Sequence, residues 1–139
     1  MPEMLLKLAD ASDRQLALDI DDMKREKKIE KAIANKECYL ITKDDILIGF
    51  VICNYNFFDL WFIDLLIIRV EYRGKGYGYQ ALSEICKLCS TKKIFTSTNE
   101  SNDHMRELLK KSDFAFAGQL NGLDEGDPEL FYYKVLTCG

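Results

Sequence analysis

The sequence predicts a mixed α/β (α+β) fold, with a central mixed sheet of about six or seven strands and helices on both faces. Two observations predict it. Short runs of β-branched and aromatic residues alternate with segments whose apolar residues have helical spacing. Their order is a strand, two helices, a three-strand meander, and then helix, strand, helix and a terminal hairpin, which requires both antiparallel and parallel pairing. With 139 residues, the chain is expected to be a single domain over 1–139.

The first half is predicted to hold a strand at residues 5–9, two helices and the meander. Ser12 or Asp13 is expected to cap a helix with Leu16, Ile20 and Met23 on its apolar face. A second helix over 24–34 places its lysines and arginines on a solvated face. The meander strands are expected at 38–42, 46–54 and 60–70, the last apolar on both faces and therefore central in the sheet.

The second half is predicted to begin with a helix over 77–91, followed by a strand over 93–98. A helix over 102–111 turns Met105, Leu108 and Leu109 inward. Residues 114–120 and 130–136 form a hairpin around an acidic loop.

Composition and charge argue against several classes of function. The net charge of −4 is unlike that of a general nucleic-acid binder, which usually carries a basic face. The most apolar run, 60–70, is broken by Asp64 and Arg69, whereas a membrane-spanning helix needs about 20 apolar residues. The first residues do not resemble a signal peptide, so a cytoplasmic location is expected.

Cys86 and Cys89 form a C-x-x-C pair, a spacing that occurs in redox and zinc sites. The pair falls inside a helical pattern rather than at a helix start, where a thiolate would be stabilised. There is no second such pair, and His104 is the single histidine, so a four-ligand zinc site is hard to assemble. We expect two small apolar residues on a helix, and no metal.

The segment most informative about function joins a buried strand to a helix at residues 70–81. Its three glycines, at 74, 76 and 78, allow the backbone to turn tightly and approach a ligand. The unpaired N–H groups and the positive end of the helix dipole attract anions, and Arg73 and Lys75 add charge. The segment predicts a site for a ligand that carries a diphosphate, the alternative being a purely structural turn.

Two other phosphate-binding motifs can be compared with this segment. The segment does not contain the G-x-x-x-x-G-K-[ST] pattern of a P-loop. Residues 76–81 do match G-x-G-x-x-A, with Glu100 placed as a ribose ligand. A dinucleotide-binding fold, however, needs several successive strand–helix–strand units, and only one crossover follows this segment.

The stretch Arg73-Gly74-Lys75-Gly76-Tyr77-Gly78 resembles the Q/R-x-x-G-x-G/A signature of the GNAT superfamily of acyl-CoA-dependent N-acyltransferases. The preceding residues 66–72 are similar to that family's fourth strand, and 102–111 with Asp113 and Phe114 resemble its Asn-led helix. The resemblance implies a GNAT-like sheet and transfer of an acetyl group from acetyl-CoA to a primary amine.

The resemblance also implies a role for each matching position. The backbone of Arg73, Gly74, Lys75, Gly76, Tyr77 and Gly78 would hold the pyrophosphate of coenzyme A. The strand end at Leu66 and Ile68 would offer backbone groups to the pantetheine arm and the thioester carbonyl, and Asn102 would contact the arm. In the family, the strands that correspond to 60–70 and 93–98 splay apart, and the acyl group sits in the cleft.

Asp64 is the candidate general base, because it is a lone carboxylate in an apolar strand and occupies the position of the family's usual Glu. Burial of a carboxylate favours its protonated form, which makes it a stronger base. The alternative is a structural or substrate-positioning carboxylate. The family's usual acid, a Tyr seven residues after the Asn, is replaced by Leu109, so Tyr132, Tyr133 or water would protonate the thiolate.

The loop over 123–129 carries four carboxylates, among them Asp127 and Glu129, which would attract a cationic acceptor. A solvated hairpin tip is the alternative. Tyr55, in an aromatic segment over 54–61, is a second candidate wall of the acceptor site, unless that segment is core. The expected partners are acetyl-CoA and an amine, without nucleic acid or membrane, and a homodimer is left open. A catalytically silent acyl-CoA-binding module is the alternative function.

Overall fold

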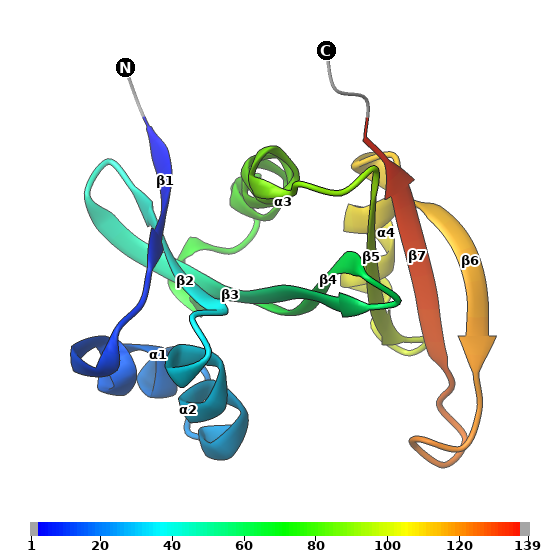
Figure 1. The fold of residues 1–139 in the computed structure, drawn as a ribbon, viewed down its shortest axis with the longest axis horizontal. Helices are drawn as coiled ribbons and strands as arrows, with labels where there is room; N and C mark the ends of the chain where they lie inside the picture. The colour runs from blue at the N-terminus through cyan, green and yellow to red at the C-terminus, as the bar shows by residue number, and fades with distance from the viewer. Residues whose placement is uncertain (1–2, 137–139) are drawn as a thin grey trace. The chain divides into compact units, whose positions relative to one another are not determined.

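The computed structural model describes residues 3–136, which form a mixed seven-stranded sheet with four α-helices (Figure 1). The strands follow the order β1-β2-β3-β4-β5-β7-β6. The predicted fold class is therefore confirmed. The chain folds as two compact units, one of Met1–Cys53 with Asp64–Ile85 and one of Asn54–Ile63 with Cys86–Gly139, and they are described separately below.

The strands match the predicted segments, with one clear extension. Pairing is antiparallel for β1–β2, β2–β3, β5–β7 and β6–β7, and parallel for β4–β5. The third strand runs three residues further than expected, because its aromatic end continues in extended conformation. The strands are β1 (Met4–Leu8), β2 (Cys38–Lys43), β3 (Ile46–Phe57), β4 (Leu60–Ile68), β5 (Lys93–Asn99), β6 (Ala115–Leu120) and β7 (Glu129–Val135).

The four helices are also where the sequence predicts them. They are α1 (Arg14–Ile20), α2 (Glu26–Ala34), α3 (Tyr77–Leu88) and α4 (Asp103–Lys111), with short 3-10 turns at η1 (Ala11–Asp13) and η2 (Val70–Tyr72). Ile29, Ala32 and Ile33 are the buried face of α2, and Ala81, Leu82 and Ile85 that of α3. Leu88 and Cys89, expected from the helical spacing on the same face, are not buried, because α3 ends at Leu88.

The apolar face predicted for the first helix is right at Ile20, which packs against the core, and wrong at Leu16 and Met23. Ala17 and Leu18 are its buried residues, while Leu16 and Met23 are 46% and 50% exposed. Asp13, one of the two predicted caps, is the N-cap residue of α1, but its side chain makes no cap hydrogen bond to the helix. The side-chain cap lies one turn earlier, where Asp10 and Asp13 form a reciprocal capping box on η1. The helix ends at Ile20, and Met23 lies beyond it in a turn with φ of 59°.

The core of the first unit lies between the two N-terminal helices and the strands beside them. Buried residues from α1, α2, β2 and β3 form one cluster, against which Leu65 and Ile67 of β4 pack. In Figure 1 the helices α1 and α2 lie together below β2 and β3. This packing fixes the part of β4 that leads into the glycine-rich turn.

The second unit buries one face of its strands more deeply than the other. On β5, Ile94, Thr96 and Thr98 are buried while the residues between them are half-buried, as expected for side chains that alternate along a strand. On β7 the buried residues are Leu130 and Tyr132. The two faces therefore differ in what they present to a ligand.

No helix of residues 3–136 is long and apolar enough to cross a membrane. Within the same range, Cys38, Cys86 and Cys89 are free thiols, and Cys138 lies outside the described residues. Burial raises the pKa of the Cys38 thiol to about 11 and also raises the pKa of Cys86. A raised pKa means less thiolate at neutral pH, which is the opposite of what a redox-active cysteine needs.

Gly49 marks a place where two strands of the first unit come unusually close. A Cβ atom at this position would lie 2.2 Å from the carbonyl oxygen of Ile67 on β4. The pairing of β2 with β3 shifts register between Ile41 and Thr42, and Ile41 is the residue that pairs with Gly49. The carbonyl of Ile48 there accepts a hydrogen bond from the N–H of Arg69, 2.7 Å away.

We expect Gly49→Ala to destabilise the protein by more than about 2 kcal/mol, because the methyl group must displace main-chain atoms of β4. The control is Gly122→Ala, where φ is 96° and the space is open, so that only backbone strain of about 1 kcal/mol is added. Thermal or urea unfolding measures both. Equal losses for the two variants would contradict the close approach.

Candidate active site

The turn from β4 into α3 is built around two glycines in the left-handed region. Gly74 has φ of 76° and Gly76 has φ of 83°, and a Cβ atom at either position would meet no atom within 4 Å. Other residues rarely adopt this conformation, so the backbone requires glycine here while the space around it stays open. An open, concave stretch of main chain results.

The helix that follows supplies main-chain donors at this turn. The N–H of Gln80 bonds to the carbonyl of Gly76, 3.2 Å away, so Gly76 ends the turn and Tyr77 begins the helix. The N–H groups of residues 77–79 precede this first intrahelical bond and have no carbonyl to bond within the helix. With the positive end of the helix dipole, they form the anion site expected from the sequence.

The cations of the turn are held by neighbours in the first unit. Arg73 donates from Nε to the carbonyl of Ile68, 2.8 Å away, which ties the turn to the end of β4. The Nζ of Lys75 lies 6.0 Å from the ring centroid of Tyr72, and the guanidinium of Arg69 lies 5.9 Å from it. Tyr72 also contacts the ring of Tyr77. The exposed cations thus stay at the turn rather than extending away from it.

A cavity of about 390 Å³ opens in the first unit between α1 and the segment that follows β4. Its wall includes Arg73, so the cavity adjoins the turn. Both acidic and basic side chains line the cavity, and Arg69 forms a salt bridge with Glu71 at 3.1 Å. The lining residues are Leu16, Asp19, Ile20, Asp22, Leu47, Arg69, Val70, Glu71 and Arg73.

Asp64 is exposed rather than buried, which corrects the expectation for its strand. Its side chain is 35% exposed, and Oδ1 accepts a bond from the Nζ of Lys28 on α2, 2.9 Å away. The strand is apolar in sequence, but α2 brings a long cation to the one acidic position. The argument that burial makes Asp64 a stronger base is therefore wrong. Its role as base stays a prediction that depends on its position in the family pattern. Leu66 and Ile68, on the same strand, are half-buried.

Asn102 and Tyr132 both lie at α4 in the second unit. Asn102 caps the helix, its side chain accepting a bond from the N–H of Met105 at 3.2 Å. Leu109, at the position of the family's usual acid, is fully buried. Tyr132, reaching from β7, lies beside Arg106 of α4, and the interaction with Tyr132 raises the pKa of Arg106.

Tyr133 points to the other face of β7, because successive residues of a strand alternate. Its ring stacks on Phe95 at 5.6 Å, and the Nζ of Lys93 lies 5.7 Å from its centroid. The two candidate acids therefore have different surroundings: Tyr132 is buried beside Arg106, and Tyr133 lies on a half-buried aromatic face.

Carboxylates of the acidic loop are bound within the second unit. Asp127 accepts bonds from the N–H and the hydroxyl of Ser101, at 3.0 and 2.6 Å, and Asp124 accepts one from Asn99 at 2.9 Å. Asp127 thus fastens the loop to the start of α4. Glu129 accepts a bond from the hydroxyl of Ser97 through Oε2, at 2.6 Å.

Tyr55 is 61% exposed, and its ring lies 6.0 Å from that of Trp61. The indole of Trp61 donates to the hydroxyl of Ser90, 3.1 Å away, so this ring is fixed by its neighbours. Tyr55 is accessible to a ligand at this edge of β3, and its role as an acceptor contact stays a prediction.

Comparisons with known proteins identify the family. A model described as Acetyltransferase (GNAT) family matches residues 5–114. The chain belongs to the GNAT acetyltransferase family. A GNAT acetyltransferase from Bacillus cereus ATCC 10987 is 33% identical, with a TM-score of 0.85 over 97% of both chains. Comparison with curated protein sequences gave no match.

More distant structures share the fold of this GNAT protein. Ard1 from Thermoplasma volcanium has a TM-score of 0.82 at 13% identity, covering 96% of this chain and 98% of its own. A putative acetyltransferase from Salmonella typhimurium, yncA, was solved with its cofactor acetyl-CoA. It has a TM-score of 0.73 at 15% identity, covering 98% of this chain and 95% of its own.

Family membership also decides between the phosphate motifs. The G-x-G-x-x-A match does not mark a dinucleotide-binding fold, since β4–β5 is parallel while β1–β2, β2–β3, β5–β7 and β6–β7 are antiparallel. The GNAT family uses acetyl-CoA, whose pyrophosphate suits the same kind of turn.

Sequence reasoning missed the partners of the predicted residues. Lys28, Ser97, Ser101 and Arg106 each hold one of the candidate side chains, at sequence separations of 26 to 36 residues. No local pattern reports such a pairing. Phe131 and Tyr133, two residues apart on β7, were a usable signal for an aromatic face of this strand.

Proposed function

We propose that this GNAT acetyltransferase transfers the acetyl group of acetyl-CoA to a primary amine, and that the β4–α3 turn binds the pyrophosphate of coenzyme A. The observation that carries the proposal is the left-handed Gly74 and Gly76 directly before the free N–H groups of α3. A pyrophosphate accepts several hydrogen bonds at once, which this run of main-chain donors can supply. Arg73 and Lys75 add positive charge at the same turn.

The reaction is a direct transfer. The neutral amine nitrogen attacks the thioester carbonyl carbon, the C–N bond forms and the C–S bond breaks. The nitrogen loses one proton to a base, and the sulfur of coenzyme A gains one. Backbone N–H groups at Leu66 and Ile68 are proposed to stabilise the oxyanion. The carbonyl of Ile68 accepts one bond from Arg73, which holds the turn against the strand end that would meet the pantetheine arm.

Asp64 is our proposed base. Lys28 occupies Oδ1 and holds the carboxylate in one orientation, so that Oδ2 is the oxygen left to receive the proton, directly or through a water. A fixed orientation favours proton transfer because less freedom is lost in the transition state.

Tyr132 is our proposed acid. It is buried at α4, the helix that in the resemblance carries the acid, whereas Tyr133 lies on the opposite face of β7. Arg106, which interacts with Tyr132, has only N–H donors, so it does not compete with the thiolate for the phenolic proton.

Acetyl-CoA at a hundredfold excess over its Kd should stabilise the protein by about 2.7 kcal/mol, which raises Tm by roughly 5–10 °C. In Gly76→Asp this shift should be lost, with affinity at least about a hundredfold weaker, because a carboxylate would face the phosphates. Gly122→Asp is the matched control, since it adds the same charge at another left-handed glycine in open space. Normal binding by Gly76→Asp would place coenzyme A elsewhere.

We expect Asp64→Asn to lower kcat about a hundredfold while the Kd of acetyl-CoA stays unchanged, because only proton transfer is lost. Stopped assays of free thiol measure kcat. Lys28→Met is the control, because it breaks the same ion pair and keeps the carboxylate. Equal losses of kcat in the two variants would assign Asp64 a structural role.

Tyr132→Phe should also lower kcat about a hundredfold without weakening acetyl-CoA, since it removes the proton donor and keeps the ring. Tyr133→Phe removes the other candidate hydroxyl. A larger loss of kcat in Tyr133→Phe than in Tyr132→Phe would reverse the assignment. Binding of acetyl-CoA without thiol release, over a broad panel of amines, would instead support a silent binding module.

A further inference from the structure

Five aromatic rings of the second unit meet on one face of its strands. Phe57 of β3 lies 4.9 Å from Phe62 of β4, 5.1 Å from Phe95 of β5 and 6.0 Å from Phe131 of β7, measured between ring centroids. Tyr133 extends the row by stacking on Phe95. These five residues are called the aromatic patch below. Their contacts join four strands, so the patch is a continuous surface.

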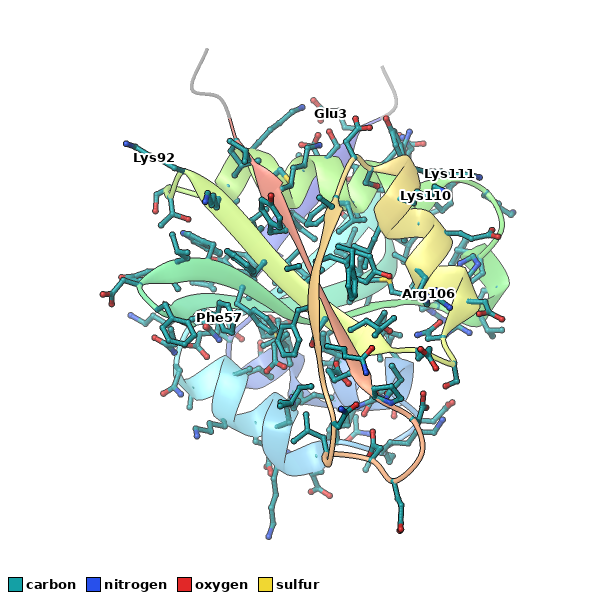
Figure 2. The ribbon with its side chains drawn as sticks, turned by 90° about the vertical axis from the view of Figure 1, so that its right-hand side faces the viewer. Glu3, Phe57, Lys92, Arg106, Lys110 and Lys111 are labelled. Atoms are coloured by element: carbon teal, nitrogen blue, oxygen red, sulfur yellow. The ribbon has the colours of Figure 1, made fainter. Side chains whose placement is uncertain are left out.

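The aromatic patch lies on the face opposite α4. Tyr132 contacts Arg106 of α4, and its neighbours Phe131 and Tyr133 therefore point the other way. Figure 2 agrees, with Phe57 and Arg106 on opposite sides of β7. All five rings are half-buried, whereas Ile94 and Leu130 on the α4 side are 0% and 4% exposed. The rings thus keep accessible surface that the other face does not have.

A fixed carboxylate stands at one end of the aromatic patch. Glu129 precedes Phe131 by two residues on β7, so both side chains leave the same face, about 7 Å apart along the strand. Ser97, whose Cα pairs with that of Phe131, donates its hydroxyl to Oε2 of Glu129 at 2.6 Å. This bond orients the carboxylate and leaves Oε1 to accept from a ligand.

A fixed cation stands at the other end. The Nζ of Lys93 lies over the ring of Tyr133, 5.7 Å from its centroid. A ligand ammonium is repelled by Lys93 and attracted by Glu129, so a bound amine would place its ammonium at the Glu129 end of the patch. The rings between the two ends favour an apolar or aromatic body, and their faces also attract an ammonium close to Glu129.

We propose that the aromatic patch and Glu129 bind the amine acceptor, and that the acceptor is a monoamine with an aromatic body a short linker away from its ammonium. This inference rests on the proposed function, whose acceptor it specifies. A linear polyamine fits less well, because its aliphatic chain makes weaker contacts with the rings and Lys93 repels a second ammonium. In the acidic loop, Ser101 occupies both carboxylate oxygens of Asp127.

The first test is direct binding, which needs no turnover. We expect 2-phenylethylammonium to bind saturably in NMR titrations of the full chain, at least about tenfold more tightly than n-butylammonium or spermidine. The resonances that move should include those of Phe131 and Glu129. Equal or weaker binding of 2-phenylethylammonium than of n-butylammonium would overturn the proposal.

Variants separate the two parts of the surface. Phe131→Leu should reduce the preference for 2-phenylethylammonium over n-butylammonium about tenfold, because one face of the ring site is lost. Glu129→Gln should weaken both ammonium ions about tenfold, because the charge is lost and the shape is kept. Tyr39→Leu, a half-buried ring on β2, and Glu125→Gln, in the acidic loop, are the matched controls. Effects of the same size in the controls would overturn the proposal.

Thiol release with acetyl-CoA then distinguishes this inference from the proposed function. Faster acetylation of 2-phenylethylamine than of n-butylamine, lost in Phe131→Leu, supports both. Specific binding of 2-phenylethylammonium without thiol release from any amine keeps the aromatic patch as a ligand site and rejects the transferase. Thiol release that favours spermidine keeps the transferase and rejects the aromatic acceptor.

Discussion

The constraint on which the site depends is the passage of the main chain from β4 into α3. Two residues there have φ near 80°, and the helix begins directly after them, so its first N–H groups remain unpaired at an open surface. The hydrogen-bond donors of the site are backbone N–H groups, and the side chains act by fixing the backbone conformation. Arg73 bonds to the carbonyl of Ile68, which makes the turn continuous with the strand end, and the packing of Leu65 and Ile67 anchors that strand.

Such a turn is readable from sequence because all its determinants are local. Gly74 and Gly76 have positive φ, a conformation that favours glycine, and α3 begins at the residue after Gly76. The two glycines and the family signature therefore both predict this turn. The same holds for α2 and α3, whose buried faces repeat over several turns. The helix α1 is too short for its periodicity to choose between Leu16 and Leu18, and a 3-10 turn with its own capping box at Asp10 and Asp13 precedes it.

Side-chain environments were less predictable, because their partners are distant in the chain. Asp64 looked buried in an apolar strand, yet Lys28 of α2 meets it at the surface. Asp127 looked like a ligand for a cation, yet Ser101 uses both of its oxygens. The sequence shows that a carboxylate is present, but it does not show which group binds that carboxylate. Whether the partner is a substrate or a residue some thirty positions away is decided by the fold.

Strand β7 illustrates how one strand serves two chemical purposes. Its register against β5 pairs seven residues, from Lys93 with Val135 to Asn99 with Glu129, and thereby sends Tyr132 to α4 while Glu129, Phe131 and Tyr133 face the other side. A shift by one residue would exchange the two sets, bury Glu129 against α4 and expose Tyr132. The proposed acid and the proposed acceptor surface therefore depend on the same hydrogen-bonded register. Residues that stabilise this register affect both, even where they contact neither.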